Sequence, residues 1–415
     1  MDNAGGKKVF FLSFVVLLLW CGTGVFALST ITGFSEFNYA LQPEDHSMAN
    51  PPGELEFPSK VSVFFDGQVD LVDFLFIRTA FSANGRNVSG NFDTTDAAFR
   101  NDELSFTFHY PMWSQFHFFS VFVGQFEAIG TDVFLKKYFG TDAISSKLLQ
   151  NRVYPNGIPL YSAPGLGAAY HVKFRAPLAA ALGFSMPSAT NASAMNAYVR
   201  LAGVSTMTSF DIALGMFTRS NPASIGIQGG ATFIVGSPYG QSLFLQAGVK
   251  NFPTAGTFDM NNIYVVLEPR FVISNLNFDL TFFALPRDEI DYDNLLFVSF
   301  ANQRSENGPL LGAAGIGLSL YNQNFFIGNL KSKLGLAVVG GLDNGIGAVV
   351  SPAADYTMAD HMHAQISPFL GINLQNGVIS MMLSIDPLNK TKIANPPQTD
   401  IVSSIRLHFG YLVHY

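Results

Sequence analysis

The 415-residue sequence contains a single cysteine, Cys21, which lies in an N-terminal segment typical of a secretory signal peptide. Two lysines precede an apolar run from Val9 to Trp20, and Val25-Phe26-Ala27 lies at the usual cleavage spacing. We therefore predict that residues 1–27 are removed. The mature chain then has no cysteine, which excludes an extracellular domain held by disulfides. The alternative, a lipid-modified Cys21, is disfavoured because Trp20 stands where lipid attachment needs a small residue.

Charge is also scarce. Charged residues make up 13% of the chain, about half of the roughly 25% that is usual in soluble globular proteins. After the N-terminal segment there is no second apolar run of about 18 residues, which excludes helical membrane spans. Low charge without long apolar runs is typical of strands that alternate lipid-facing and polar side chains. A secreted β-sandwich or propeller would carry more charge, and the formal net charge of −7 argues against a nucleic-acid partner.

The stretch from Ile405 to Tyr415 alternates apolar and mixed positions with a period of two, which predicts a strand. About eleven residues is also the length that a tilted strand needs to cross a bilayer. An aromatic last residue with apolar residues alternating back from it resembles the C-terminal signal of bacterial outer-membrane β-barrels. The resemblance implies a porin-like barrel in the bacterial outer membrane, part of the cell envelope. It also implies that the β-barrel assembly machinery recognises Phe409, Tyr411, Val413 and Tyr415.

Similar segments recur through residues 28–415, which show no internal repeat and no break that would mark a second domain. Alternation and turn residues predict strands over 31–41, 61–69, 74–81, 103–110, 116–126, 168–175, 179–186, 198–206, 210–218, 225–235, 243–250, 263–272, 276–284, 295–303, 311–321, 333–340, 346–356, 363–374, 378–385 and 405–415.

The connections between the first strands alternate between long and tight. Residues 42–58 and 82–102 form long connections, whereas 70–73 and 111–114 form tight turns. Outer-membrane barrels have tight periplasmic turns and long outer loops, which requires an even number of strands. We therefore predict an all-β fold, a transmembrane antiparallel up-and-down β-barrel of about 18 strands, within an even range of about 16 to 20. We expect the first and last strands to pair and close the sheet into a barrel, because each unpaired backbone group in hydrocarbon costs several kcal/mol.

Charged side chains on the predicted strands are expected to point into the lumen, because an Arg or Lys facing mid-membrane lipid costs about 2–4 kcal/mol. His171, Lys173 and Arg175 form a row with a period of two, along which an anion or a sugar could be attracted. Arg406 is placed in the lumen by the same cost. The candidates for lumen selectivity are His171, Lys173, Arg175, Arg200, Arg270, Glu268 and Asp211. The alternative is that they pair with carboxylates such as Glu103 and Asp279 and only solvate the interior.

The longest connection, residues 127–167, follows the fifth predicted strand. It has the same ordinal place as the loop that folds into the lumen of general porins, which implies an inward-folded constriction loop. Its charged candidates are Asp132, Lys136, Lys137, Asp142, Lys147 and Arg152. Phe119 and Phe283, both assigned to inward faces, would form a stacking track for sugars or hold this loop.

The resemblance implies a channel for passive or weakly selective diffusion of small hydrophilic solutes such as ions, sugars and anions. The alternatives are a fatty-acid-type transporter of hydrophobic compounds and an adhesin on a barrel scaffold. No catalytic motif is present, and we predict no enzyme activity, no cofactor and no metal. The expected partners are outer-membrane lipid, the assembly machinery and the solutes, and a homo-oligomer is left open.

Overall fold

The computed structural model describes most of the predicted strands. The described residues are 29–40, 59–85, 97–128, 130–131, 133–141, 146, 164–187, 195–218, 225–237, 240–254, 256–286, 312–342, 362–385, 387–388, 390–391, 398–399 and 405–414. The predicted signal peptide and the strands predicted over 295–303 and 346–356 lie outside these residues.

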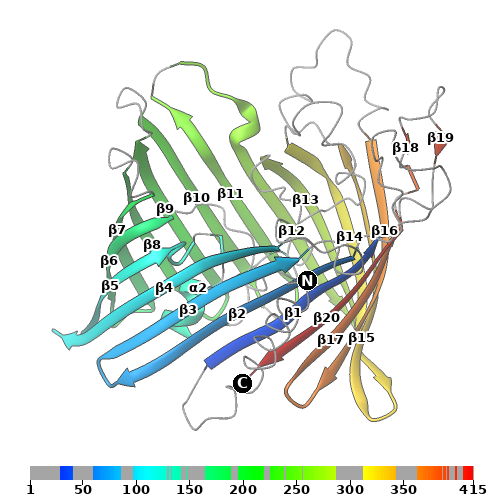
Figure 1. The fold of residues 1–415 in the computed structure, drawn as a ribbon, viewed down its shortest axis with the longest axis horizontal. Helices are drawn as coiled ribbons and strands as arrows, with labels where there is room; N and C mark the ends of the chain where they lie inside the picture. Colours follow the sequence, from blue (N-terminus) through cyan, green and yellow to red (C-terminus); the bar gives the residue numbers. More distant parts are fainter. Residues whose placement is uncertain are drawn as a thin grey trace, which may run out of the picture.

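Eighteen of the strands form one sheet (Figure 1). They are β1 (Ser29–Ala40), β2 (Ser59–Val72), β3 (Leu75–Gly85), β4 (Ala97–Met112), β5 (Gln115–Gly124), β6 (Gly165–Lys173), β7 (Leu178–Met186), β8 (Asn196–Val204), β9 (Thr208–Thr218), β10 (Ile225–Gly236), β11 (Ser242–Pro253), β12 (Ile263–Ile273), β13 (Leu276–Pro286), β14 (Gly312–Ile327), β15 (Leu330–Leu342), β16 (Met362–Leu374), β17 (Gly377–Ile385) and β20 (Ile405–His414). Two short strands, β18 (Lys390–Thr391) and β19 (Gln398–Thr399), pair only with each other. The described residues also include helix α2 (Val133–Phe139) and the 3₁₀ turn η2 (Met260–Asn262).

Strand β20 joins the two ends of the sheet. It pairs antiparallel with β17, where Val378 lies opposite Leu412, and with β1, where Ile31 lies opposite His414. Consecutive strands from β1 to β17 are also paired antiparallel, so every strand of the sheet has a neighbour on both sides. Pairing on both sides satisfies the backbone groups over the middle of the described strands, as a hydrocarbon environment requires. The predicted antiparallel barrel with an even strand number near 18 is confirmed.

Tight turns and long connections alternate as predicted. The β4–β5 turn consists of Trp113 and Ser114, whose φ angles are 53° and 64°. Positive φ at both central residues is the geometry that two-residue hairpins prefer. The β2–β3, β14–β15 and β16–β17 turns lie on the lower side of the barrel in Figure 1. Within the described residues, no helix is long and apolar enough to cross a bilayer.

The third and fourth strands extend further than the sequence predicts. Strand β4 has 16 residues, and Ser82 and Asn84 of β3 lie opposite Arg100 and Ala98. These residues were predicted to belong to a polar connection. The backbone ladder continues past the apolar stretch because polar side chains are tolerated once a strand leaves the hydrocarbon layer.

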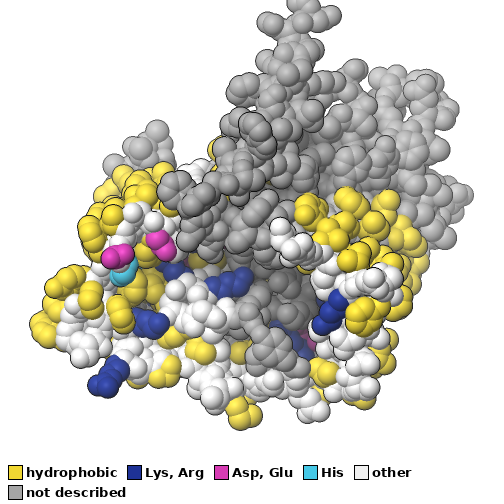
Figure 2. All heavy atoms as spheres, turned by 90° about the horizontal axis from the view of Figure 1, so that it is seen from below, with side chains coloured by type: hydrophobic (Ala, Val, Ile, Leu, Met, Phe, Trp, Pro, Cys, Tyr) yellow, Lys and Arg dark blue, Asp and Glu magenta, His cyan; other side chains and the backbone are white. Residues whose placement is uncertain are grey.

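Exposure alternates along the strands and defines an outer and an inner face. On β4, Phe106 and Phe108 are exposed, whereas Glu103, Ser105 and Thr107 are buried. Seen from below, hydrophobic side chains cover the left and right flanks of the molecule, with most of the visible Lys and Arg between them (Figure 2).

One face assignment was wrong. Phe119 alternates with buried Ser120 and Phe122 and points outward with 51% of its surface exposed. The neighbouring strands decide which side chains of a strand point inward. Phe119 lies opposite Phe108 and Tyr170, which both point outward. Phe283, assigned to the inner face in the same way, is buried.

Candidate functional site

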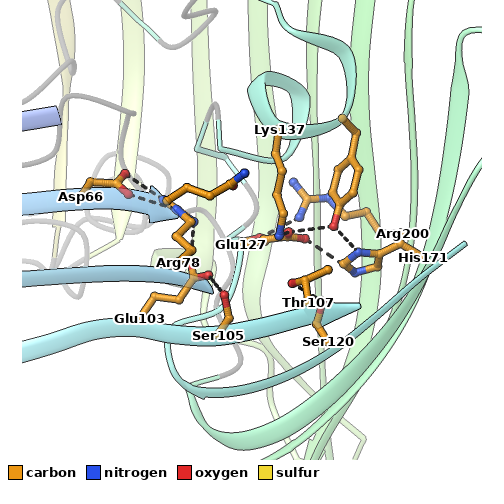
Figure 3. A network of polar contacts seen from close by, with 12 residues as sticks. Asp66, Arg78, Glu103, Ser105, Thr107, Ser120, Glu127, Lys137, His171 and Arg200 are labelled. Atoms are coloured by element: carbon orange, nitrogen blue, oxygen red, sulfur yellow. Dashed lines mark hydrogen bonds and ion pairs between the residues drawn. The ribbon is translucent and has the colours of Figure 1, made fainter. Parts of the chain in front are cut away.

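A chain of ion pairs begins on the inner face of β2, β3 and β4 (Figure 3). Arg78 donates from Nε and Nη2 to both carboxylate oxygens of Asp66, at 3.0 and 2.8 Å. Its Nη1 donates to Oε2 of Glu103 at 2.6 Å, and Ser105 donates to the other oxygen of Glu103 at 2.7 Å. Arg78 thus bridges carboxylates from the two strands that flank β3, and the fork geometry of a guanidinium favours such bidentate pairing.

Glu127, at the start of the long connection, is the centre of a second cluster (Figure 3). Its Oε1 accepts hydrogen bonds from Lys137 Nζ at 2.5 Å and from the Tyr138 hydroxyl at 3.0 Å. Its Oε2 lies 3.6 Å from Nε2 of His171, and its backbone carbonyl accepts from Arg200 Nη1 at 2.6 Å. A buried carboxylate is strongly unfavourable unless it is paired in this way.

Burial by itself raises the pKa of Glu127, but the charges of Lys137, His171 and Arg200 outweigh burial and lower this pKa from 4.5 to about 2. Burial, followed by the Glu127 carboxylate, raises the pKa of Tyr138 well above its usual value of 10.0. At neutral pH the cluster therefore holds an ionised carboxylate and a protonated phenol. Because the Tyr138 hydroxyl donates its hydrogen bond to Glu127, the Tyr138 oxygen accepts a hydrogen bond from Nδ1 of His171, 2.5 Å away, when that nitrogen carries a proton.

Arg200 of β8 connects this cluster to the barrel wall. Its Nε donates to Asp211 of β9 at 2.7 Å, and its Nη2 donates to the second oxygen of the same carboxylate. The guanidinium carbon lies 4.0 Å from the ring centroid of Phe134, on helix α2. The ion pair with Asp211 holds Arg200 within the wall, and Arg200 holds the connection by a hydrogen bond to Glu127 and a cation–π contact with Phe134.

Helix α2 packs inside the barrel against small residues. Phe134, Leu135 and Tyr138 of α2 form a buried cluster with Ala179, Ala181, Ala202 and Ile234. The three alanines lie at inward positions of β7 and β8. Because their side chains end at Cβ, the helix can approach the strands closely and bury its aromatic face against them.

The connection also reaches strands β11 and β12. Ser146 donates to Oε2 of Glu268 at 2.6 Å, and this oxygen also accepts from Thr281 at 2.8 Å. Arg270 donates to the other oxygen of Glu268 at 2.8 Å. Further along the wall, Gln246 donates to the backbone carbonyl of Gly130 at 3.0 Å. Described residues of the connection therefore contact inward side chains from β6 to β12.

The structure places five of the predicted lumen residues in two clusters and the other two at the end of β6. His171, Arg200 and Asp211 belong to the cluster around Glu127, and Glu268 and Arg270 form the pair on β12. The Lys173 ammonium lies 5.6 Å from the ring centroid of Phe139. Arg175 is exposed in the turn between β6 and β7.

Among the predicted residues of the connection, Lys137 lies in the Glu127 cluster and Lys136 is half-buried on α2. Asp132, Asp142, Lys147 and Arg152 lie outside the described residues. In the predicted assembly signal, Phe409 is exposed and Tyr411 is partly exposed. The Val413 and Arg406 side chains and the whole of Tyr415 are not described.

Several residues of the clusters were not predicted as site residues, among them Asp66, Arg78 and the alanines beneath α2. Arg78 could have been found, because it lies within the strand predicted over 74–81 and the cost of an Arg facing lipid would have placed it on the inner face. The alanines carry no charge or motif, so only the packed helix reveals their role. In the part of the chain that the structure describes, no group of three or more His, Cys, Asp or Glu side chains is placed to hold a metal ion.

No protein-family model matches this sequence, and a search of curated proteins finds no match. Among solved structures, the chain is similar to a BenF-like porin from Pseudomonas fluorescens Pf-5, with 11% identity and a TM-score of 0.47 over 94% of this chain and 98% of that one. It is similar to Pseudomonas aeruginosa OprD, with 8% identity and a TM-score of 0.46 over 94% of both chains. It is also similar to Salmonella typhi OmpF, with 10% identity and a TM-score of 0.40 over 94% of this chain and 97% of that one.

The class of protein follows from the chain's own strand pairing and faces. A ring of eighteen antiparallel strands has an apolar outer face and an inner face rich in ion pairs. This combination defines an up-and-down β-barrel of the transmembrane kind.

Proposed function

We propose that the protein is a porin-like channel of the bacterial outer membrane, through which small hydrophilic solutes diffuse passively or with weak selectivity. One observation carries the proposal: the barrel wall has lipid-compatible side chains outside and ionic groups inside. An Arg or Lys costs about 2–4 kcal/mol when it faces mid-membrane lipid, so such a wall suits a membrane with polar contents on its inner side. Cleavage of residues 1–27 and recognition of the C-terminal strand by the assembly machinery belong to the same proposal.

The connection between β5 and β6 is the proposed constriction. Its support is the set of contacts that Glu127, Tyr138 and Ser146 make with inward side chains of β6 and β12. A segment held against the wall in this way reduces the cross-section through which a solute can pass. Residues 127–167 would then act as the constriction loop of a single barrel domain that covers residues 28–415.

Lys173 and Arg175 are the proposed selectivity residues of the mouth beside the β6–β7 turn. The other predicted lumen charges have close partners: Arg200 pairs with Asp211, Arg270 pairs with Glu268, and His171 lies beside Glu127. A paired charge has a weaker long-range field than a single charge. We therefore assign the paired residues to anchoring and leave selectivity at this mouth to Lys173 and Arg175.

Planar-bilayer conductance of the refolded mature chain, together with liposome swelling in a series of sugars, tests the function. Channel activity predicts stepwise conductance and swelling rates that fall as the sugar becomes larger. A barrel that inserts but neither conducts nor allows swelling would refute the channel and favour a hydrophobic-compound transporter or an adhesin. The same bilayer samples, cross-linked and sized, would show whether the barrel forms a homo-oligomer.

A further inference from the structure

Two rows of side chains cross the inner face of β4, β5, β6 and β7 near the β6–β7 turn. Strand pairing places Pro111, Phe116, Lys173 and Ala179 in the first row, and His109, Phe118, His171 and Ala181 in the second. The second row lies beneath α2, where the Phe118 ring is 4.9 Å from the Tyr138 ring. The first row is one step closer to the turn and leads from the helix to the mouth of the barrel.

Phe116 is the open aromatic residue of the first row. It lies two residues before Phe118 and four before buried Ser120, so all three belong to the inner face. Phe116 is nevertheless 47% exposed, although it points into the barrel and away from lipid. Phe139, the last residue of α2, packs against the buried helix cluster and is itself only partly buried. The mouth therefore presents an aromatic surface to water beside the end of the helix.

Two cations without carboxylate partners stand next to this aromatic surface. Lys173 lies directly opposite Phe116 in the β5–β6 register, and its ammonium is 5.6 Å from the ring centroid of Phe139. Within the part of the chain that the structure describes, Lys173 forms no ion pair with a carboxylate, and neither does exposed Arg175. Both cations can therefore meet an anion that arrives from the mouth.

The described carboxylates around this mouth do not neutralise the two cations. Asp70 and Asp73 lie at the turn between β2 and β3, and β4 and β5 separate them from Lys173 on β6. Asp70 also accepts a hydrogen bond from Gln68 at 3.2 Å. Glu127, which lies beside His171 in the second row, is already paired with the Lys137 ammonium. Among the described residues, the charge beside Phe116 is therefore positive, which attracts an anion to the β5–β6 side of the mouth.

We propose that this mouth holds a binding site for organic anions that carry an aromatic ring. The ring contacts Phe116, and the anionic group contacts Lys173 and Arg175. The inference rests on the proposed channel function and names a class of solute that the channel holds at its mouth. Aromatic rings recognise one another by stacked or edge-to-face contact. Ammonium and guanidinium groups bind oxyanions by charge-assisted hydrogen bonds. A small inorganic anion lacks the first contact and an uncharged arene lacks the second, so a solute with both is preferred.

Fluorine NMR of para-fluorobenzenesulfonate, titrated with the refolded mature protein in detergent micelles, tests the site. Binding should broaden the fluorine signal beyond the broadening caused by protein-free micelles. Benzenesulfonate should displace the probe about tenfold more effectively than methanesulfonate, which has the charge without the ring, because the ring contact is lost. Benzyl alcohol, which has the ring without the charge, should also be about tenfold less effective because no charged hydrogen bond forms.

Variants of the first row locate the site. Phe116→Ala should weaken binding of the probe about threefold to tenfold, as loss of an aromatic contact implies. Lys173→Gln combined with Arg175→Gln should weaken it by about tenfold or more. The matched controls are Phe119→Ala, the same change on the outward face at 51% exposure, and Lys331→Gln, at an exposed cation beside the β14–β15 turn. Both controls should bind the probe as the native protein does.

Equal weakening by Phe116→Ala and Phe119→Ala would overturn the site, and so would displacement by methanesulfonate as effective as displacement by benzenesulfonate. Planar-bilayer recordings separate this outcome from failure of the channel itself, since benzenesulfonate should reduce the ion current of the native protein more than that of Phe116→Ala. Ring-dependent binding in a protein that does not conduct would refute the proposed function and keep the site. Conductance without ring-dependent binding would refute the site alone.

Discussion

The ammonium of Lys137 lies 2.5 Å from the carboxylate of Glu127, and both side chains are buried inside the barrel. Lys137 belongs to helix α2 and Glu127 stands just after β5, so the pair holds the helix to the start of its own connection. Glu127 also has a φ angle of 42°, an uncommon conformation for a residue other than glycine. Burial, charge and backbone conformation therefore all single out Glu127 as the residue that holds helix α2 in place.

Glu127→Gln should destabilise the barrel and loosen its inner helix. The change leaves Lys137 without its carboxylate, and removal of one partner of a buried pair costs about 3–5 kcal/mol. Urea unfolding of the refolded protein measures the loss. Asp70→Asn, at an exposed carboxylate, is the control and should change stability by less than about 0.5 kcal/mol. Equal stability of the two variants would show that the ion pair contributes nothing.

The stabilisation from Glu127 should depend on pH in the acid range. Because the folded pKa of about 2 lies below the usual 4.5, the contribution is complete above pH 4.5 and is lost as pH falls towards 2. The stability difference between the native protein and Glu127→Gln should therefore shrink over that window. A difference that stayed constant from pH 5 to pH 2 would contradict the lowered pKa.

Lys173→Glu combined with Arg175→Glu should shift ion selectivity towards cations. Both residues lie at or just beyond the end of β6, and reversing them changes the field that an entering ion meets. Reversal potentials in a salt gradient measure the shift, and the pair Lys173→Gln with Arg175→Gln should give an intermediate value. Unchanged potentials in both variants would remove these residues from selectivity.

Removal of residues 132–151 should raise single-channel conductance. This segment includes α2 and Ser146, which contact inward side chains of the wall. Its loss would widen the space available to ions. A deletion of residues 392–397, between β18 and β19, is the control and should leave conductance close to its native value. Similar conductance in both deletions would place the connection outside the pore.

Ala181→Leu should destabilise α2 by overpacking. Ala181 is buried beneath the helix, and extra methylene groups in a filled core cost about 1–3 kcal/mol. Ala180→Leu makes the same change one residue away, on the outward face, and should be tolerated. The difference between the unfolding free energies of the two variants separates the packing effect from the change in strand propensity, which both variants share. If Ala180→Leu were the more damaging variant, the face assignment of β7 would be wrong.

Much of the fold was predictable because a strand shows its faces in its sequence. On β9, Asp211 alternates with Ile212 and Leu214, and the structure buries the first and exposes the other two. Phe119 shows the limit of this reasoning. β5 is apolar on both faces near its middle, so its parity is decided by the neighbouring strands and not by its own pattern.

The sequence by itself determined the alternation of apolar and polar positions and the need to pair every strand edge. Both follow from local chemistry, since a side chain's face depends only on its position in the strand. Only the tertiary structure decided which charges neutralise each other. Arg200 meets the carbonyl of Glu127 from 73 residues away, and Ser146 meets Glu268 from 122 residues away. Such contacts depend on where the connection between β5 and β6 packs inside the barrel. The alternation along a strand carries no information about contacts between residues so far apart in the sequence.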